Sequence, residues 1–503
     1  IAHNLHQTIH CDSPIQKQPP STSTNPDAPQ KPAGARALIP YSELQRHNTR
    51  GDLWVLIDGE VYNATGIIDT HPGGVGPLLK NGGKDATKAF KPIHPPGTLS
   101  SLPTGAHIGS IDPATIPKGA NEPTAEELRI AKARDALPAP QEVLNLSEIE
   151  ALAQTVLTAT AWGYYRSAGD DNNTFDENRN AFKRFWFRPR VLNKISHAST
   201  ESTLFGLPVS LPIWIAPAAL ARLGHPDGEM NLTRAAGKEG IIHGISSNSS
   251  CSIDEITSVK DPKQHLIFQL YVNRHRPATA ELLPTLRKRG FSALMLTVDA
   301  AVSGKRELDM RMKGDFDAPS NGKKATENVK GVGQSIMGYQ DPDVCWDDIP
   351  WIRSLTDLPL ILKGIQCVED AEKAFDQYKV DAIILSNHGG RDLDFSPSPM
   401  TLLYELRQRR PDLLEKHEVH IDGGVTRGTD VLKALCLGAK GVGLGRAFLY
   451  ANGCWGEEGV QRVIEIMREE IIRGMQFMGV TSLDQLGPHM VRYEPEAAGR
   501  TKL

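Results

Sequence analysis

The stretch DAIILSNHGGRDLD, residues 381–394, joins an apolar run to a cluster of polar residues and glycines. AIIL reads as a buried strand, and His388, two glycines and Arg391 follow within six residues of its end. One interpretation is a strand that runs into a polar turn, because glycine adopts backbone angles that other residues avoid. The alternative is a functional site at the end of the strand.

Seven similar apolar runs lie elsewhere after residue 144, and stretches compatible with helices, such as GTDVLKALCLG, separate most of them. The runs are LPIWIAP, GIIHGISS, HLIFQLYV, ALMLTVD, LPLILKG, VHIDGG and GVGLGRAF. Apolar strands that alternate with helices predict a parallel sheet covered on both faces. Eight such units in about 300 residues favour an α/β TIM barrel, (β/α)8. An open doubly wound sheet would carry GxGxxG after its first strand, whereas GVGLGRA is one residue short and lies at the wrong end.

Polar residues stand where seven consecutive strands end. In a TIM barrel the catalytic side chains come from the carboxyl ends of several strands. Each residue alone is compatible with a structural role, but seven such ends together favour an active site on this face. The strand-end residues are Ser246, Ser247, Gln269, Tyr271, Thr297, Asp299, Lys363, Ser386, His388, Arg391, Asp422, Gly445 and Arg446.

The last two strand ends carry DGG at 422–424 and GLGR at 443–446. Barrels commonly bind phosphate at this place. Glycine lets backbone N–H groups approach the anion, and Arg446 offers a charged fork. Two plain glycine turns remain the alternative interpretation.

Three other strand ends have side chains suited to proton transfer or to binding negative charge. An imidazole such as that of His388 titrates near neutral pH and suits a general base, which Asp299 can orient. Lys363 can face negative charge that develops on a cofactor ring. Arg391 offers a two-point grip on a carboxylate. Residues 381–394 therefore predict a base and an anion clamp on one strand end.

Composition excludes several classes of protein. The chain has 503 residues, is 39% hydrophobic and 23% charged, and has a net charge of −4, which is typical of globular domains. There is no basic excess for nucleic acid, and no apolar run approaches the roughly 18 residues that span a membrane. The six cysteines show no CxxC spacing, which argues against a zinc site or a disulfide framework.

The length predicts more than one domain. Residues 1–36, rich in Pro, Ser and Thr, are expected to be disordered. Residues 37–112 are expected to form a small α+β domain, in which the DG of LWVLIDGEVYNAT signals a hairpin. Residues 113–143 read as a linker with one short helix, residues 144–490 as the barrel, and residues 491–503 as a tail. Because the chain begins at Ile1, we expect a processed product whose targeting segment is not visible.

From about residue 147 to 490 the chain resembles the FMN-dependent L-2-hydroxy-acid oxidase and dehydrogenase family. The motifs that carry the resemblance are SNHGGRDLD, LTVDA, FQLYV, LILKG, IDGGV and KALCLGAKGVGLGRAFLYANGC. The resemblance implies that His388 is the base and pairs with Asp299. Tyr271 would bind the substrate hydroxyl, and the carboxylate would lie near Tyr164, Arg391 and the more mobile Arg306. The implied FMN-binding residues are Ala216, Pro217, Ala218, Ala219, Ser246, Gln269, Thr297, Lys363, Ser386, Asp422, Gly423, Gly424, Val425, Thr426, Gly445 and Arg446.

Residues 38–111 resemble the cytochrome b5 haem domain, through THPGG and KPIHPPG. The resemblance implies that His71 and His94 fill both axial positions of a haem b iron. Such a centre favours electron transfer over oxygen binding. By the same resemblance Tyr164 would also touch a haem propionate.

Three features depart from the family pattern. DGGVTRGTD has Thr426 where the family usually has an arginine near the FMN phosphate. Asn248 stands where relatives often carry a large apolar residue beside the substrate. The stretch from Glu307 to Cys345 matches a loop of variable length that we expect to be mobile.

The two resemblances together imply oxidation of an L-2-hydroxy acid, with L-lactate to pyruvate preferred, and one-electron transfer through haem to cytochrome c. The alternatives are an oxidase that uses oxygen, a dehydrogenase for a larger acid such as mandelate, and a haem electron carrier with an inactive barrel. Resemblance also implies a homotetramer in the mitochondrial intermembrane space, with the cytoplasm as the alternative location. We expect no nucleic-acid partner and no membrane span.

Overall fold

The computed structural model describes residues 38–71, 73–120, 122–313 and 331–495. The chain forms two units. The first contains the described residues up to His71, together with Val75–Phe90 and Gly97–Glu122, and the second contains Pro123 onward with two short segments, 72–74 and 91–96. The predicted disordered segment, residues 1–36, lies outside the described residues. Of the stretch from Glu307 to Cys345 that was expected to be mobile, residues 314–330 lie outside them, and the described remainder contains α11 (Glu307–Lys313) and α12 (Val332–Ile336).

The first unit is built on a four-stranded antiparallel sheet in the order β1-β2-β3-β4. Its elements are α1 (Tyr41–Arg46), β1 (Asn48–Thr49), β2 (Asp52–Ile57), β3 (Glu60–Asn63), α2 (Val75–Asn81), α3 (Thr87–Phe90) and β4 (His107–Ser110). Asp58 and Gly59 have φ angles of 52° and 83° and form the turn between β2 and β3. These are the positive angles that a tight hairpin turn needs, so the predicted hairpin is confirmed.

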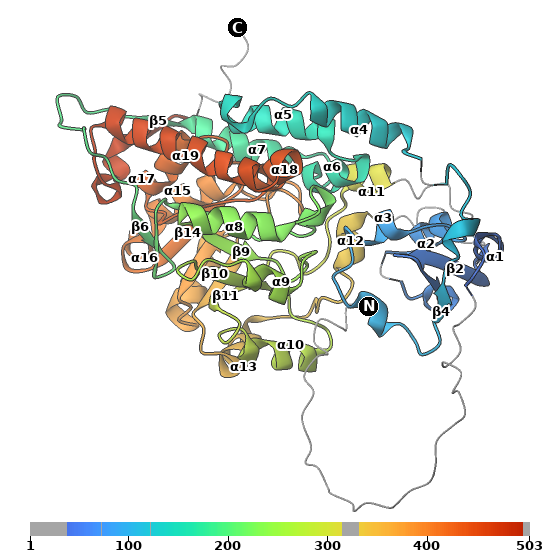
Figure 1. The fold of residues 1–503 in the computed structure, drawn as a ribbon. Helices are drawn as coiled ribbons and strands as arrows, with labels where there is room; N and C mark the ends of the chain where they lie inside the picture. The colour runs from blue at the N-terminus through green and yellow to red at the C-terminus, as the bar shows by residue number, and fades with distance from the viewer. Residues whose placement is uncertain (1–37, 72, 121, 314–330, 496–503) are drawn as a thin grey trace, which may run out of the picture. The chain divides into compact units, whose positions relative to one another are not determined.

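The second unit contains the closed eight-stranded parallel barrel that the sequence predicts (Figure 1). Each predicted apolar run forms one strand. The strands are β8 (Ile213–Ile215), β9 (Ile242–Ile245), β10 (Leu266–Leu270), β11 (Phe291–Thr297), β12 (Leu360–Ile365), β13 (Ala382–Leu385), β14 (Glu418–Asp422) and β15 (Val442–Leu444). The barrel closes where β15 pairs with β8.

Alternation along the strands separates two layers inside the barrel. Successive side chains of a strand point to opposite faces, so residues two apart share the interior. Trp214, Ile267, Met295, Ile361 and Ile384 belong to one buried apolar cluster inside the barrel. Two positions further along β10, β11, β12 and β13, toward the carboxyl end, stand Gln269, Thr297, Lys363 and Ser386. The period of two therefore places a polar layer above an apolar plug.

Helices cover the barrel, and α8, α18 and α19 pack against one another on its outside (Figure 1). The helices of the barrel repeats and their extensions are α8 (Glu229–Glu239), α9 (Ile253–Ser258), α10 (Arg276–Leu282), α11 (Glu307–Lys313), α12 (Val332–Ile336), α13 (Ile349–Leu355), α14 (Val368–Glu372), α15 (Pro399–Arg409), α16 (Pro411–Lys416), α17 (Gly428–Leu437), α18 (Arg446–Trp455) and α19 (Glu457–Met478). Short strands β6 (Ser202–Leu204) and β7 (Leu207–Val209) form a separate hairpin.

Four further helices precede the barrel in the second unit: α4 (Ala125–Asp135), α5 (Leu146–Val156), α6 (Ala159–Arg166) and α7 (Asn173–Ala181). Although α4 lies within the predicted linker, residues 113–143, it belongs to this unit. Arg129 of α4 donates to the carbonyl of Thr155, and Glu126 accepts from the backbone N–H of Ala159. The expected tail also begins inside the fold, because β16 (Val491–Tyr493) pairs with β5 (Phe185–Phe187).

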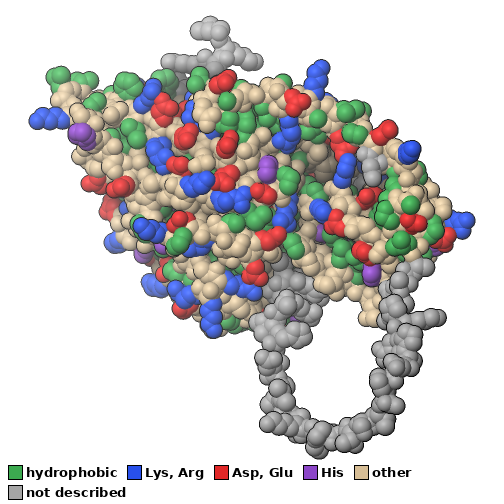
Figure 2. All heavy atoms as spheres, in the orientation of Figure 1, with side chains coloured by type: hydrophobic (Ala, Val, Ile, Leu, Met, Phe, Trp, Pro, Cys, Tyr) green, Lys and Arg blue, Asp and Glu red, His purple; other side chains and the backbone are tan. Residues whose placement is uncertain are grey.

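Charged side chains of both signs are interspersed on the face of the second unit drawn in Figure 2. This distribution agrees with a net charge close to zero for a chain of this length. Among the described residues, no helix is both long and apolar enough to cross a membrane.

Candidate active site

A pocket opens at the carboxyl ends of the barrel strands, where TIM barrels hold their active sites. Most residues predicted for the FMN and substrate sites line this pocket. They are Tyr164, Ala216, Pro217, Ala218, Ala219, Ser246, Gln269, Tyr271, Thr297, Arg306, Lys363, His388, Arg391, Asp422, Gly423, Gly424, Val425, Thr426, Gly445 and Arg446. Of the other predicted barrel residues, Asp299 and Ser386 lie beneath the lining and contact it.

Lys363 is the centre of a buried charge network below the pocket. Its Nζ donates to Oγ of Ser386 at 3.0 Å and lies 3.4 Å from Oδ2 of Asp422 and 3.7 Å from Oδ2 of Asp299. Burial by itself would lower the pKa of Lys363, but the charges of Asp299 and Asp422 outweigh burial and raise that pKa. The ammonium group therefore keeps its charge in the interior.

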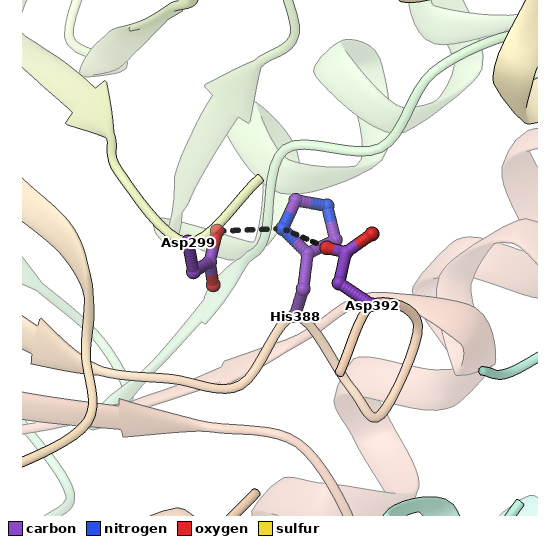
Figure 3. A group of neighbouring side chains, drawn as sticks. All are labelled: Asp299, His388 and Asp392. Carbon is purple, nitrogen blue, oxygen red and sulfur yellow. Dashed lines mark hydrogen bonds and ion pairs between the residues drawn. The ribbon is translucent and has the colours of Figure 1, made fainter. Parts of the chain in front are cut away.

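His388 lies against Asp299 at the end of β13. Its Nδ1 is 2.8 Å from Oδ1 of Asp299, which comes from the end of β11 (Figure 3). Burial would raise the pKa of Asp299, but Lys363 and then His388 lower it. The carboxylate thus stays ionised, fixes the imidazole through Nδ1 and leaves Nε2 for a substrate.

The two glycines after His388 let the chain turn sharply at the pocket. His388, Gly389 and Gly390 have φ angles of 57°, 66° and 74°, a left-handed region that is costly for side chains other than glycine. A Cβ on Gly390 would lie 2.7 Å from the backbone nitrogen of Phe175. The turn at His388, Gly389 and Gly390 is therefore strained; it orients the histidine side chain and lets α7 pack close behind it.

Arg391 and two tyrosines complete the wall around His388. The Tyr271 hydroxyl lies 3.5 Å from Nε2 of His388, and the guanidinium carbon of Arg391 lies 5.1 Å from the centroid of the Tyr164 ring. Burial raises the pKa of both tyrosines, so both phenols stay protonated and can donate hydrogen bonds. Arg391 donates to the carbonyls of Tyr165 and Ser167, which fixes its orientation.

Asp392 is a site residue that the sequence analysis did not predict. Figure 3 shows His388 between Asp299 and Asp392, and Oδ2 of Asp392 lies 3.8 Å from His388 Nδ1. Oδ1 of Asp392 lies 3.0 Å from Nη2 of Arg306, which also donates from Nε to the carbonyl of Arg391. Arg306 was expected to be mobile, yet here it is only 4% exposed. The difference follows from Asp392, whose charge holds the guanidinium in place.

The glycine turns and several buried polar atoms fit FMN. Gly423 and Gly424 have φ angles of 88° and 78°, which bring the backbone close to a ligand without a Cβ. Nε2 of Gln269, Oγ1 of Thr297 and Oδ1 of Asp422 are buried without a hydrogen-bond partner in the described structure. Buried polar atoms normally have partners, and a flavin ring with its ribityl chain presents the donors and acceptors that these three atoms lack.

The first unit has apolar side chains that fit a haem. Val75, Leu78 and Leu79 on α2 and Phe90 on α3 are large, apolar and only partly buried. Partly exposed apolar residues on helices mark a surface that a macrocycle can cover. His71 precedes α2 and is half-buried, whereas His94 belongs to a short segment grouped with the second unit. Their shared axial role stays a prediction.

The fold and pocket define an α/β-barrel enzyme built around a phosphorylated cofactor. Residues 153–493 match the family of FMN-dependent dehydrogenases, and residues 40–112 match the cytochrome b5-like haem/steroid-binding domain. The chain belongs to the FMN-dependent dehydrogenase family and carries a cytochrome b5-like domain ahead of its barrel. FMN and haem are the cofactors of these two parts.

Relatives with both parts are similar over most of the chain. The chain is 39% identical over 454 residues to the L-lactate dehydrogenase (cytochrome) of Wickerhamomyces anomalus, covering 89% of this chain and 78% of that protein. It is 40% identical over 473 residues to the protein of the same name from Saccharomyces cerevisiae, covering 90% and 79%. A solved mutant of flavocytochrome b2 superposes with a TM-score of 0.68 at 40% identity, covering 75% of this chain and 94% of that one.

Proposed function

We propose that this protein oxidises L-lactate to pyruvate and passes the electrons one at a time through haem to cytochrome c. The observation that carries the proposal is the position of His388, with Asp299 at Nδ1 and Tyr271 at Nε2, beside Arg391 in the flavin pocket. The names of the two-domain relatives support lactate and cytochrome as the reactants.

The residues divide the reaction between binding and proton transfer. Arg391 binds the substrate carboxylate with its planar fork, and the Tyr164 phenol donates to the same group. Tyr271 binds the hydroxyl, and Nε2 of His388 accepts one of the two protons that lactate loses; the other proton and the two electrons would be taken up by FMN. Asp299 stabilises the imidazolium that results. FMN supplies the two-electron acceptor, Lys363 faces the charge that develops on it, and haem supplies the one-electron relay.

Rapid mixing with L-lactate without oxygen tests the reaction. Flavin absorbance should bleach first, haem should then be reduced, and added cytochrome c should be reduced at the steady-state rate. In a separate assay in air-saturated buffer, oxygen uptake that exceeds cytochrome c reduction would instead support an oxidase. Faster flavin reduction by mandelate than by lactate would support a dehydrogenase for larger acids. If neither acid bleaches the flavin, the result would support a haem electron carrier whose barrel is inactive.

We further propose that His71 and His94 are the axial ligands of the haem iron. His71→Ala or His94→Ala should then abolish the low-spin spectrum and cytochrome c reduction, while lactate still reduces the flavin. His107→Ala is the matched control, because this exposed histidine of the same unit pairs with Glu60. Unchanged cytochrome c reduction in both ligand variants would remove the haem unit from the electron path.

The contact of Tyr164 with the haem propionate and the assembly of the protein are also proposals. If Tyr164 contacts the propionate as the resemblance implies, Tyr164→Phe should slow haem reduction more than flavin reduction. By similarity to the two-domain relatives we propose a homotetramer in the mitochondrial intermembrane space, with the cytoplasm as the alternative. Light scattering of the purified protein and fractionation of its source cells test these two points.

A further inference from the structure

Three arginines surround one aromatic ring that lines the pocket. The guanidinium carbons of Arg166, Arg179 and Arg446 lie 3.9, 4.8 and 4.8 Å from the centroid of Phe175. Phe175 and Arg179 come from α7, Arg166 ends α6, and Arg446 begins α18. Attraction to the ring face contributes to holding each cation, but it does not cancel their mutual repulsion.

Among the described residues, one carboxylate forms ion pairs with these arginines. Glu150 of α5 pairs with Arg179 at 2.7 Å and with Arg166 at 3.6 Å. Arg446 instead donates to three backbone carbonyls, those of Tyr165, Gly389 and Ser167. Burial, followed by the charges of Arg391, Arg166 and Arg179, lowers the pKa of Arg446 to about 9. The three arginines and Glu150 together carry a net charge of plus two, which is the charge that a phosphate dianion would neutralise.

The DGG turn lies directly on the helix that carries Arg179. A Cβ placed on Gly424 would stand 2.1 Å from the carbonyl oxygen of Asn178 and 2.9 Å from the backbone nitrogen of Arg179. Arg179, Gly424 and Arg446 all line the pocket. The turn that the sequence predicts as a phosphate site and the arginine cluster therefore belong to one end of one cavity.

Thr426 and Arg427, which lie just after the turn, pair with acidic residues of α17 and α19. The Thr426 hydroxyl donates to Oδ2 of Asp430 at the start of α17. Arg427 pairs with Glu470 of α19 at 2.6 Å, and its side chain is 48% exposed. Neither side chain brings a positive charge to the turn, so the charge at this end comes from α6, α7 and α18.

We propose that Arg179 binds the phosphate of FMN and supplies the charge that Thr426 does not provide. The proposal rests on FMN being the cofactor of the barrel. Arg179 has a 36% exposed side chain, so its guanidinium can share its five N–H donors between Glu150 and a phosphate oxygen. The close packing of the Gly424 turn on Asn178 and Arg179 places α7 directly beside the predicted phosphate site.

Titration of the apoprotein with FMN and with riboflavin tests the proposal, because riboflavin lacks the phosphate. Arg179→Gln should weaken FMN binding by about 10- to 100-fold, the usual effect of losing a hydrogen bond to a charged group. Its affinity for riboflavin should stay within about twofold of the parent value. The control is Arg184→Gln, because Arg184 also pairs with a glutamate, Glu177, but does not line the pocket.

Two further variants separate a phosphate contact from a structural role. Glu150→Gln removes the competing carboxylate, so FMN should bind as tightly as to the parent or more tightly. Thr426→Arg, added to Arg179→Gln, should restore most of the lost FMN affinity. Equal affinities of the parent and Arg179→Gln for FMN would overturn the proposal, as would equal losses for FMN and riboflavin. If the parent binds FMN but lactate does not bleach it, the proposed function fails while the role of Arg179 is still decided by the titrations.

Discussion

The two ends of the pocket differ in how their charges balance. At the base end, around His388, three buried cations face four carboxylates: Lys363, Arg306 and Arg391 against Asp299, Asp309, Asp392 and Asp422. At the phosphate end, around Phe175, three arginines face Glu150. The base end has no excess of positive charge to neutralise, whereas the two excess positive charges of the phosphate end favour a bound anion.

The difference matches what each end has to do. A substrate carboxylate brings one negative charge to the base end, and the proton that His388 accepts brings one positive charge. These two charges cancel, so the net charge of the base end stays the same during turnover. The base end therefore has no excess charge that would hold substrate or product permanently. The phosphate end keeps its excess charge throughout turnover, which suits a cofactor that stays bound.

Removing the base should have the largest effect and should be confined to one end. His388→Ala should slow flavin reduction by lactate by about 10²–10⁴-fold, the usual contribution of a general base. The dissociation constant of FMN should not change, because the arginine cluster is untouched. Stopped-flow reduction and FMN titration measure the two effects, and a parallel loss of FMN affinity would show that the ends are not independent.

Removing one negative charge from the base end should lower the stability of the fold. Asp392→Asn keeps the shape of the side chain but removes the carboxylate that contacts the buried Arg306, which then retains only the charge of Asp309, without an ion pair to it in the described structure. The free energy of unfolding should fall by up to about 3–5 kcal/mol. Denaturant unfolding, followed by circular dichroism, measures this loss. The control is Asp412→Asn, since the solvent-exposed pair of Asp412 with Arg410 is screened by water and should contribute little to stability. Similar losses in the two variants would contradict a special role for Asp392.

Changing the shape of a cation at the base end should have a smaller effect. Arg391→Lys keeps the charge but loses the planar fork, so kcat/KM for lactate should fall by about 10- to 100-fold. FMN affinity should remain that of the parent. Steady-state kinetics with unchanged kcat/KM would remove Arg391 from the substrate site.

Adding a cation to the phosphate end should have the smallest effect. With Arg179 present, Thr426→Arg should tighten FMN binding by less than about tenfold, because the end already carries enough charge for a dianion. Titration of the apoprotein gives the dissociation constants. A gain above about 100-fold would mean that the arginine cluster does not reach the phosphate.

The strand-end residues could be predicted because their positions depend on local periodicity. Once Ile267 and Ile361 are assigned to the barrel interior, alternation places Gln269 and Lys363 in the same interior at the carboxyl end. Asp299 and His388 follow their strands directly, so the closure of the barrel brings them together. These residues needed no knowledge of loop conformation beyond the strand order.

Asp392 and Arg179 could not be found in this way. Asp392 is visible as the first acidic residue after Arg391, but whether it faces the base depends on the left-handed turn from His388 to Gly390. Arg179 lies on a helix outside the eight repeats, in a sequence with ordinary surface composition. The one departure of the turn from the family pattern, Thr426, was the available hint that part of its charge comes from elsewhere.

The sequence by itself determined the barrel, the polar layer at its carboxyl end and which strand end carries which functional residue. Side-chain alternation and strand ends depend on residues that are neighbours in the chain. Only the tertiary structure decided which distant helix supplies charge to the phosphate end. Gly424 meets Asn178 and Arg179 only after β15 pairs with β8 and α7 packs behind Gly390. Contacts between segments far apart in the chain depend on backbone shape and excluded volume, and no local pattern of residues encodes them.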